Sequence, residues 1–112
     1  MISFDEINAF LRQDLQQRYC IEISFSVDGI PEYDECWMGK MPDSQNPAKD
    51  VYWYGLVHDG SQAYDYDALD DFLSAPVFHG QSLQQVWNQV TLETVNGGDP
   101  ECWFPRRDHI QR

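Results

Sequence analysis

Apolar and polar positions follow two different periods over the first quarter of the chain. Residues 3–6 read SFDE, a capping box in which the serine and glutamate side chains each accept a hydrogen bond from the other residue's backbone. Apolar residues then recur about once per turn, which predicts an amphipathic helix over about 4–19. The segment 21–27, IEISFSV, alternates strictly between apolar and polar residues and predicts a half-buried strand.

Three further segments predict strands. Residues 36–41, CWMGKM, form the first, and Gly39 within it marks a bulge or a close approach of neighbouring backbone. Residues 42–50 contain two prolines with Asp, Ser and Asn, and predict a loop at a hairpin tip. Residues 51–57, VYWYGLV, are rich in strand formers, and residues 63–66 alternate after an HDGS turn. Together these segments predict a meander of antiparallel strands.

Two short helices and a last strand complete the pattern. Asp67 is predicted to cap a helix over 68–74, which ends before a proline. The sequence SLQQ is a second capping box, and the apolar spacing after it predicts a helix over 83–90. Residues 91–95 alternate as a final strand. This order predicts a single α+β domain over 1–112, with an antiparallel sheet of about four to five strands, an N-terminal helix and two short helices.

The C-terminal segment changes character within a few residues. Trp103 and Phe104 are expected to pack back onto the body of the domain. The residues after them, 105–112, hold three of the seven basic residues of the chain. They are predicted to form a flexible basic tail.

Net charge narrows the range of partners. Nineteen acidic residues stand against seven basic ones, for a net charge of −12. Nine of the acids fall between Asp50 and Pro105, a span with no Lys or Arg. Such a surface repels nucleic acid and anionic membranes, and it attracts basic protein surfaces. The alternative is that the charge serves solubility alone.

The cysteine pattern and the chain ends indicate a compartment. The three cysteines are Cys20, Cys36 and Cys102, an odd and widely spaced set that makes a poor disulfide framework. The first ten residues lack the basic and apolar blocks of a secretory signal, and no apolar run is long enough to cross a membrane. We therefore expect reduced thiols and a cytoplasmic location. No cofactor motif is present.

No catalytic motif joins the reactive residue types. Glu35 beside Cys36 is expected to raise the pKa of that thiol and so weaken it as a nucleophile. The histidines are His58, His79 and His109, and none lies near a cysteine in sequence. We therefore predict that the chain is not an enzyme. A small hydrolase would require a Cys or Ser within hydrogen-bond reach of a His.

The segment 52–73, YWYGLVHDGSQAYDYDALDDFL, concentrates four tyrosines and five carboxylates without a Lys or Arg. Its aspartates have three interpretations. Asp67, Asp70 and Asp71 suit the first turn of a helix, where negative charge is favoured. They also suit a patch that faces a partner. A metal site is the third interpretation, although the spacing of a calcium-binding loop is absent.

Alternation divides the aromatic residues of this segment between two faces. Trp53 is predicted to lie in the core, with Tyr52 and Tyr54 on the opposite face of the strand. Tyr64 and Tyr66 are expected across the hairpin from them. Such a face is either cross-strand packing or an interface that binds arginine through ion pairs and cation–π contacts. Base stacking is disfavoured because RNA-binding sheets place Lys and Arg beside their aromatic residues.

With its aromatic and acidic hairpin YWYGLVHDGSQAYDYD, small size and high negative charge, the chain resembles the immunity proteins of bacterial toxin systems, including contact-dependent growth inhibition. The resemblance implies a protein that binds a basic toxin domain, often a nuclease, and covers its substrate cleft. The partner-binding hypothesis names eight residues: Asp59, Tyr64, Asp65, Tyr66, Asp70 and Asp71, with Tyr52 and Tyr54 as second choices. The alternative is a non-catalytic interaction or structural module, monomeric or homodimeric, with no toxin partner.

Overall fold

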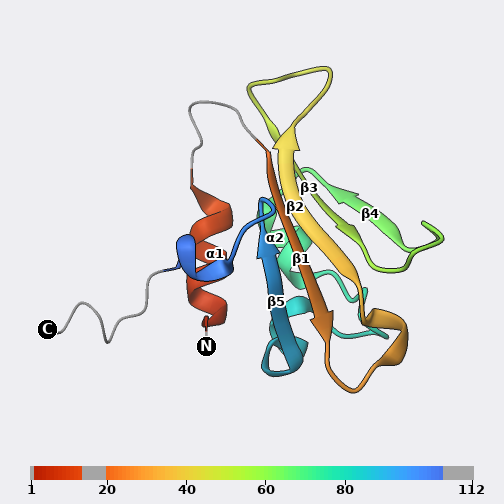
Figure 1. The fold of residues 1–112 in the computed structure, drawn as a ribbon. Coiled ribbons are helices and arrows are strands. Elements are labelled where there is room, and N and C mark those ends of the chain that lie inside the picture. The colour runs from red at the N-terminus through yellow and green to blue at the C-terminus, as the bar shows by residue number, and fades with distance from the viewer. Residues whose placement is uncertain (1, 14–19, 105–112) are drawn as a thin grey trace, which may run out of the picture.

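The computed structural model describes residues 2–13 and 20–104 and forms an α+β domain around one five-stranded antiparallel sheet (Figure 1). The strand order is β4-β3-β2-β1-β5. The strands are β1 (Ile21–Val27), β2 (Cys36–Pro42), β3 (Asp50–Gly55), β4 (Ala63–Tyr66) and β5 (Val90–Val95). The first four strands form the predicted meander. The last returns to pair with β1, so the strand that follows the helices closes the other side of the sheet.

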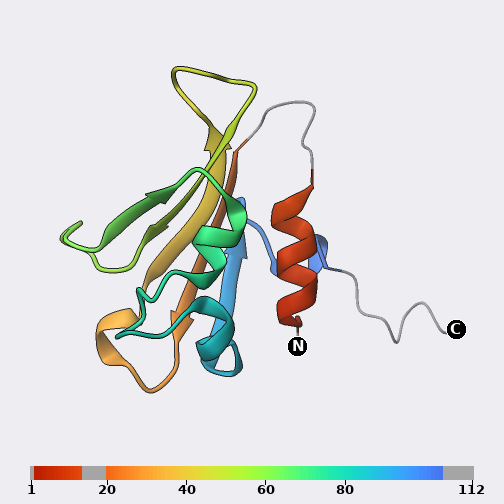
Figure 2. The ribbon, with the colours of Figure 1, turned by 180° about the vertical axis from the view of Figure 1, so that it is seen from behind.

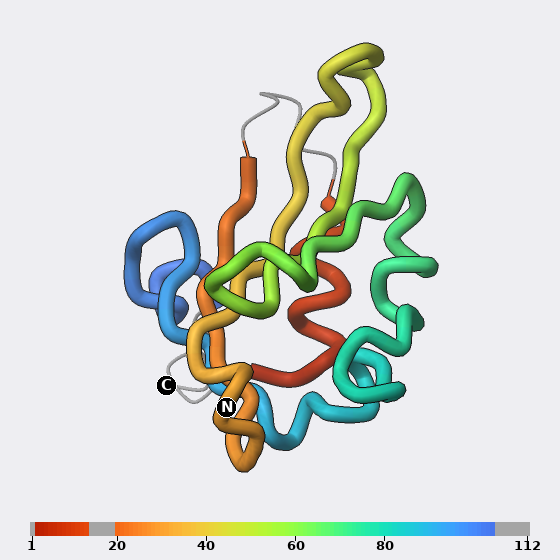
Figure 3. The backbone as a smooth tube through the Cα atoms, turned by 90° about the vertical axis from the view of Figure 1, so that its right-hand side faces the viewer, coloured from red at the N-terminus to blue at the C-terminus, as the bar shows by residue number. Residues whose placement is uncertain are grey.

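Three α-helices pack on one face of the sheet, which we call the covered face. They are α1 (Phe4–Arg12), α2 (Leu69–Ser74) and α3 (Leu83–Val86), with short 3₁₀ turns at Pro31–Tyr33, Trp87–Gln89 and Pro100–Cys102. Figure 2 shows α2 in front of the strands with α1 alongside them. In Figure 3 the strands lie in front of α1, the red helix. The opposite face of the sheet is exposed to solvent.

The covered face and the helices share one apolar core. Ile21, Ile23 and Phe25 of β1 are fully buried, as their alternation predicted. Helix α1 contributes Ile7 and Leu11, which are also fully buried. Both predicted capping boxes form at the N-termini of α1 and α3, so local sequence sets where these helices begin.

Helix α1 is shorter than its apolar spacing predicted. It ends at Arg12, and Gln13 has an extended ψ of 140°. The predicted continuation over 14–19 lies outside the described residues. Lys40 of β2 stands at this helix end, where its Nζ donates to the carbonyl oxygens of Leu11 at 2.8 Å and Gln13 at 2.5 Å. A buried ammonium thus satisfies carbonyls that a helix C-terminus leaves unpaired.

Two other local predictions need correction. Asp67 does not cap α2, because the N-cap residue is Ala68 and no side chain bonds the helix N-terminus. The predicted helix over 83–90 is α-helical only for its first turn and continues as the 3₁₀ turn Trp87–Gln89. The apolar periodicity survives this change, since Leu83, Val86 and Trp87 are all buried.

The C-terminal end of the described chain packs against α1. Phe104 is buried, and its ring lies 4.9 Å from that of Phe10, centroid to centroid. Trp103 makes a second edge contact with Phe10 at 5.7 Å. These contacts confirm that the two aromatic residues pin the chain onto the domain. The predicted basic tail, 105–112, lies outside the described residues.

Candidate binding surface

The solvent-exposed face of the sheet carries large apolar side chains. Trp37 of β2 is 44% exposed and Met41 of the same strand is 45% exposed, while Trp53 of β3 is partly buried. Side chains alternate across a strand, so the partners of these residues in the register share their face. We call this surface the open face, and it comprises Glu22, Ser24, Trp37, Gly39, Met41, Val51, Trp53, Gly55, Ala63 and Asp65.

Each tryptophan of the open face lies opposite a glycine on the neighbouring strand. Trp37 pairs with Gly55, and Trp53 pairs with Gly39. A Cβ atom on Gly39 would lie 3.1 Å from Cζ2 of Trp53 and 1.9 Å from the carbonyl oxygen of Ile21. Gly39 is therefore the predicted close approach, and the indole of Trp53 extends over backbone that has no side chain in its way.

Carboxylates extend the row that contains Trp53. Asp65 of β4 pairs with Trp53 on one side, and Glu22 of β1 pairs with Gly39 on the other. Both residues are exposed, and within the described part of the chain neither carboxylate has an ion pair or a side-chain hydrogen bond. Lys40 is the one basic residue in the five strands, and its side chain lies on the covered face. The open face is thus apolar and negatively charged.

Of the predicted site residues, Tyr54 is withdrawn from the surface altogether. It is 1% exposed, its ring stacks on Phe72 at 4.0 Å, and its hydroxyl donates to the Phe72 carbonyl oxygen at 2.9 Å. Burial raises the pKa of Tyr54 far above its usual range. The side chain is a core element of the covered face and does not reach a partner.

The other predicted tyrosines also face the helices. Tyr52, Tyr64 and Tyr66 are partly buried against the core, and burial raises the pKa of Tyr52 and of Tyr66. The prediction that Trp53 is in the core and the tyrosines lie outside is therefore wrong. The core side and the solvent side of β3 are the opposite of those predicted. Alternation divides the side chains of a strand into two sets, but it does not determine which set the helices cover.

The predicted aspartates do not form one patch. Asp65 lies on the open face, as described above. Asp59 is exposed in the loop between β3 and β4, where it accepts a hydrogen bond from the Ser61 backbone at 2.9 Å, and hydrogen bonds from Ser61 lower its pKa. Asp70 and Asp71 lie on α2, on the far side of the sheet. The hypothesis thus joined residues that the fold separates.

Asp70 also has an internal partner. Its carboxylate accepts a hydrogen bond from Arg12 of α1 at 2.9 Å, and the pair is exposed on both sides. Arg12 bonds the side chain of Asn8 as well. A surface pair of this kind is worth little to stability, about 0–1 kcal/mol, but it leaves Asp70 less available to a partner than Asp65.

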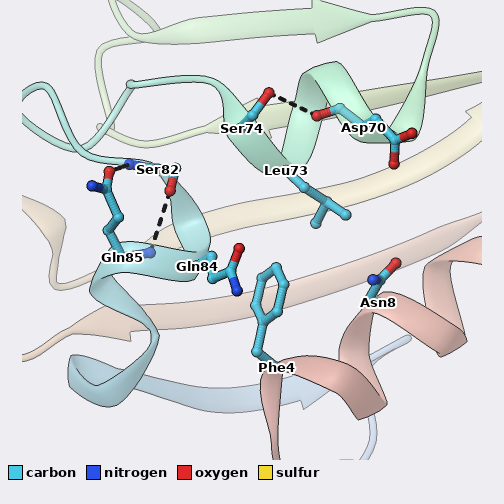
Figure 4. Close-up of a pocket in the computed structure, with 8 residues that line it drawn as sticks. All are labelled: Phe4, Asn8, Asp70, Leu73, Ser74, Ser82, Gln84 and Gln85. Carbon is cyan, nitrogen blue, oxygen red and sulfur yellow. Dashed lines mark hydrogen bonds between the residues drawn. The ribbon is translucent and has the colours of Figure 1, made fainter.

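A small groove lies beside this pair, between the three helices (Figure 4). It has a volume of about 350 Å³ and is lined by Phe4, Asn8, Asp70, Leu73, Ser74, Ser82, Gln84 and Gln85. Several of its polar groups serve local structure, since Ser74 donates to the Asp70 carbonyl oxygen at 2.8 Å and Ser82 forms the α3 capping box. The one charged lining residue, Asp70, pairs with Arg12, and the neutral polar groups used in this way give the groove no clear ligand chemistry.

Of the three cysteines, Cys36 is buried in the core. Cys36 is fully buried, and its Sγ donates to the Leu56 carbonyl oxygen at 3.3 Å. Burial, with smaller contributions from Asp34 and Glu93, raises the pKa of the Cys36 thiol to about 12. Cys20 and Cys102 are exposed.

Both described histidines contact glutamates of the segment before β2. His58 lies 2.5 Å from a carboxylate oxygen of Glu35, and His79 lies 2.7 Å from one of Glu32. His109 lies outside the described residues. These contacts join the loop after β3 and the turn before α3 to one acidic segment, which is a structural use of the imidazoles.

The described residues show neither a metal-binding cluster nor a membrane-spanning helix. Over 2–13 and 20–104, no three His, Cys, Asp or Glu side chains gather closely enough to bind a metal ion. Over the same residues, every helix is too short or too polar to traverse a bilayer.

Sequence reasoning missed Glu22, Trp37 and Met41, although a signal for them exists. The polar positions of β1, which include Glu22 and Ser24, mark the solvent side of that strand. Antiparallel pairing then carries this side across the register from Ser24 to Trp37. Combining the alternation of one strand with the pairing of the next would have identified the open face.

Comparison of the chain with family models, with curated proteins and with solved structures finds no match. The functional interpretation therefore depends on the geometry and charge of the open face.

Proposed function

We propose that this chain is a non-catalytic binding protein that engages a basic protein domain through the open face. In the cytoplasm it would act as an immunity protein, neutralising a toxin domain by covering its substrate cleft. The observation that carries the proposal is the combination of exposed Trp37 and Met41 and partly buried Trp53 with two carboxylates that have no partner in the described residues.

The composition of the open face suits a protein partner. Protein interfaces are enriched in Trp and Met, and tryptophans are frequent energetic hot spots. A net charge of −12 accelerates encounter with a basic domain and makes the association sensitive to salt. A nuclease is a suitable partner class because its cleft is basic where it binds phosphates, and carboxylates from an inhibitor can occupy those positions.

The proposal is tested with tagged protein in the native cell. Wild type and the Trp37→Ser variant are used to capture partners at low and high salt, with Asp71→Asn on the other side of the sheet as the control. We expect one basic partner that is retained at low salt, weakened at high salt, lost with Trp37→Ser and kept with Asp71→Asn. The purified partner should then lose its toxicity or enzymatic activity when the wild-type protein is added at equal concentration.

Two outcomes would contradict the proposal. Capture that is unchanged by Trp37→Ser would show that the partner binds another surface. A partner whose activity continues at full rate in the complex would show that the protein is not an inhibitor.

The second candidate is a structural module that dimerises through the open face. The exposure of Trp37 and Met41, 44% and 45%, favours it, because large exposed apolar side chains also drive self-association. The charges of the open face disfavour this dimer, because two-fold symmetry would bring Asp65 and Glu22 of the two copies toward one another and like charges repel. A dimer on sizing that is lost with Trp37→Ser and that forms equally well at low and high salt would favour this second candidate.

A further inference from the structure

The open face also indicates which side chain the partner presents. We propose that Trp53, Asp65 and Glu22 form a receptor for an arginine side chain. This inference rests on the proposed function, because it names the residue that a basic partner would place on the open face. The inference depends on one row of paired residues that crosses four strands: Glu22 of β1, Gly39 of β2, Trp53 of β3 and Asp65 of β4.

The position of Trp53 is set by the glycine next to it. The ring atom Cζ2 lies 3.1 Å from where a Cβ atom of Gly39 would be, so the six-membered part of the indole reaches over β2. Any larger residue at position 39 would displace the ring and collide with the Ile21 carbonyl oxygen. Because Trp53 lies on the solvent side of the sheet and is only partly buried, part of its π surface stays accessible.

Asp65 and Glu22 lie on opposite sides of Trp53 in this row. Asp65 is one strand from Trp53, and Glu22 is two strands away on the other side. With neighbouring strands ~4.8 Å apart, the backbone positions of Asp65 and Glu22 are separated by ~14 Å. The indole occupies the middle of that span, so a planar cation on the ring has a carboxylate within reach at each edge.

Arginine satisfies this arrangement better than lysine. A guanidinium is planar, stacks on an indole face and donates two parallel hydrogen bonds to a carboxylate from one edge. An ammonium is compact and strongly hydrated, and it cannot use the ring and a bidentate carboxylate together. The basic side chains of the described strands do not compete, since Lys40 bonds the end of α1 on the covered face.

The test uses two capped peptides of equal charge, one with three arginines separated by glycines and one with three lysines at the same positions. Each is titrated into ¹⁵N-labelled protein, and the indole N–H signals and backbone amides are followed by NMR. We expect the arginine peptide to bind at least about threefold more tightly, and the largest shifts to fall on the Trp53 indole and on Asp65 and Glu22. Comparison at equal charge removes the general attraction of any cation to this protein.

Variants of Trp53, Asp65 and Glu22 then test whether these residues cause the preference for the arginine peptide. Trp53→Leu should abolish the difference between the two peptides, and Asp65→Asn and Glu22→Gln should each weaken arginine binding about two- to fivefold. Asp71→Asn removes the same charge from the covered side and should leave the preference unchanged. Because Asp65 and Glu22 are exposed and their replacements are isosteric, these two variants test the row even if Trp53→Leu is unstable.

Equal affinity for the two peptides, or shifts concentrated on α2 or the loop 56–62, would overturn the inference. These results are separate from the test of function. A native partner that binds through Trp37 while the peptides show no arginine preference would leave the proposed function in place and remove the arginine receptor. An arginine preference at Trp53 with no inhibited partner would support the arginine receptor and contradict the proposed function.

Discussion

The two faces of the sheet differ in how their polar groups are satisfied. On the covered face, polar atoms are buried and each is paired: Lys40 bonds the carbonyl oxygens at the end of α1, and the Tyr54 hydroxyl bonds the Phe72 carbonyl oxygen. On the open face, carboxylates stand beside tryptophans and have no partner within the described residues. Burial makes an unpaired polar group expensive, so the covered face must be self-sufficient. Solvent removes that requirement on the open face, which is where unpaired groups can be kept for a partner.

The largest effect is expected at the buried ammonium. Lys40→Met keeps the aliphatic volume but leaves the carbonyl oxygens of Leu11 and Gln13 without their donor. We expect a loss of about 3 kcal/mol in the free energy of unfolding, measured by urea denaturation. Lys49→Met, at an exposed lysine in the loop before β3, is the control and should stay within about 0.5 kcal/mol of wild type. Similar denaturation midpoints for the two variants would show that the covered face does not depend on this contact.

A matched pair of glycine variants compares close packing within the open face itself. Gly39→Ala places a Cβ atom 1.9 Å from the Ile21 carbonyl oxygen, whereas Gly55→Ala meets nothing within 4 Å. We expect Gly39→Ala to lower the free energy of unfolding by about 2–3 kcal/mol, and Gly55→Ala to be neutral or to raise it by about 0.5 kcal/mol. Thermal melts of both variants measure the difference. Equal melting temperatures would mean that the backbone at Gly39 relaxes without cost.

The smallest effect, over the pH range measured, concerns the Cys36 thiol in the core of the covered face. The Cys36 thiol has an ordinary pKa of 9.0 and a pKa of about 12 in the folded protein, so the unfolded chain ionises first. Its contribution to stability is complete below pH 9 and is lost as the pH rises toward 12, on the order of 1.4 kcal/mol per pH unit.

Cys36→Ala should therefore reduce the fall in urea midpoint between pH 8 and pH 10.5. Tyr54 has a raised pKa and acts in the same direction, so the slope is reduced and does not vanish. A wild-type midpoint that is flat over this range would contradict the burial of both groups.

Local sequence patterns predicted which helices and strands form and where several of them begin. Strict alternation predicted β1 at its observed bounds, and the sequences SFDE and SLQQ predicted where α1 and α3 begin. Both signals depend on neighbours in sequence, through side-chain direction and backbone capping. The end of α1 was not predictable in this way, because Lys40 caps it from a strand 27 residues away from Gln13.

The residues of the candidate site were also predictable only in part from local sequence. The sequence by itself determined the acidic charge, the α+β class and the separation of Trp53 from Tyr54 onto opposite faces of one strand. Only the tertiary structure decided that the helices cover the tyrosines, so that Tyr54 joins the core while Trp37, Trp53 and Asp65 face solvent. The physical reason is that the period of a strand is a local property, whereas the choice of the buried face depends on where the helices after β4 and before β1 pack.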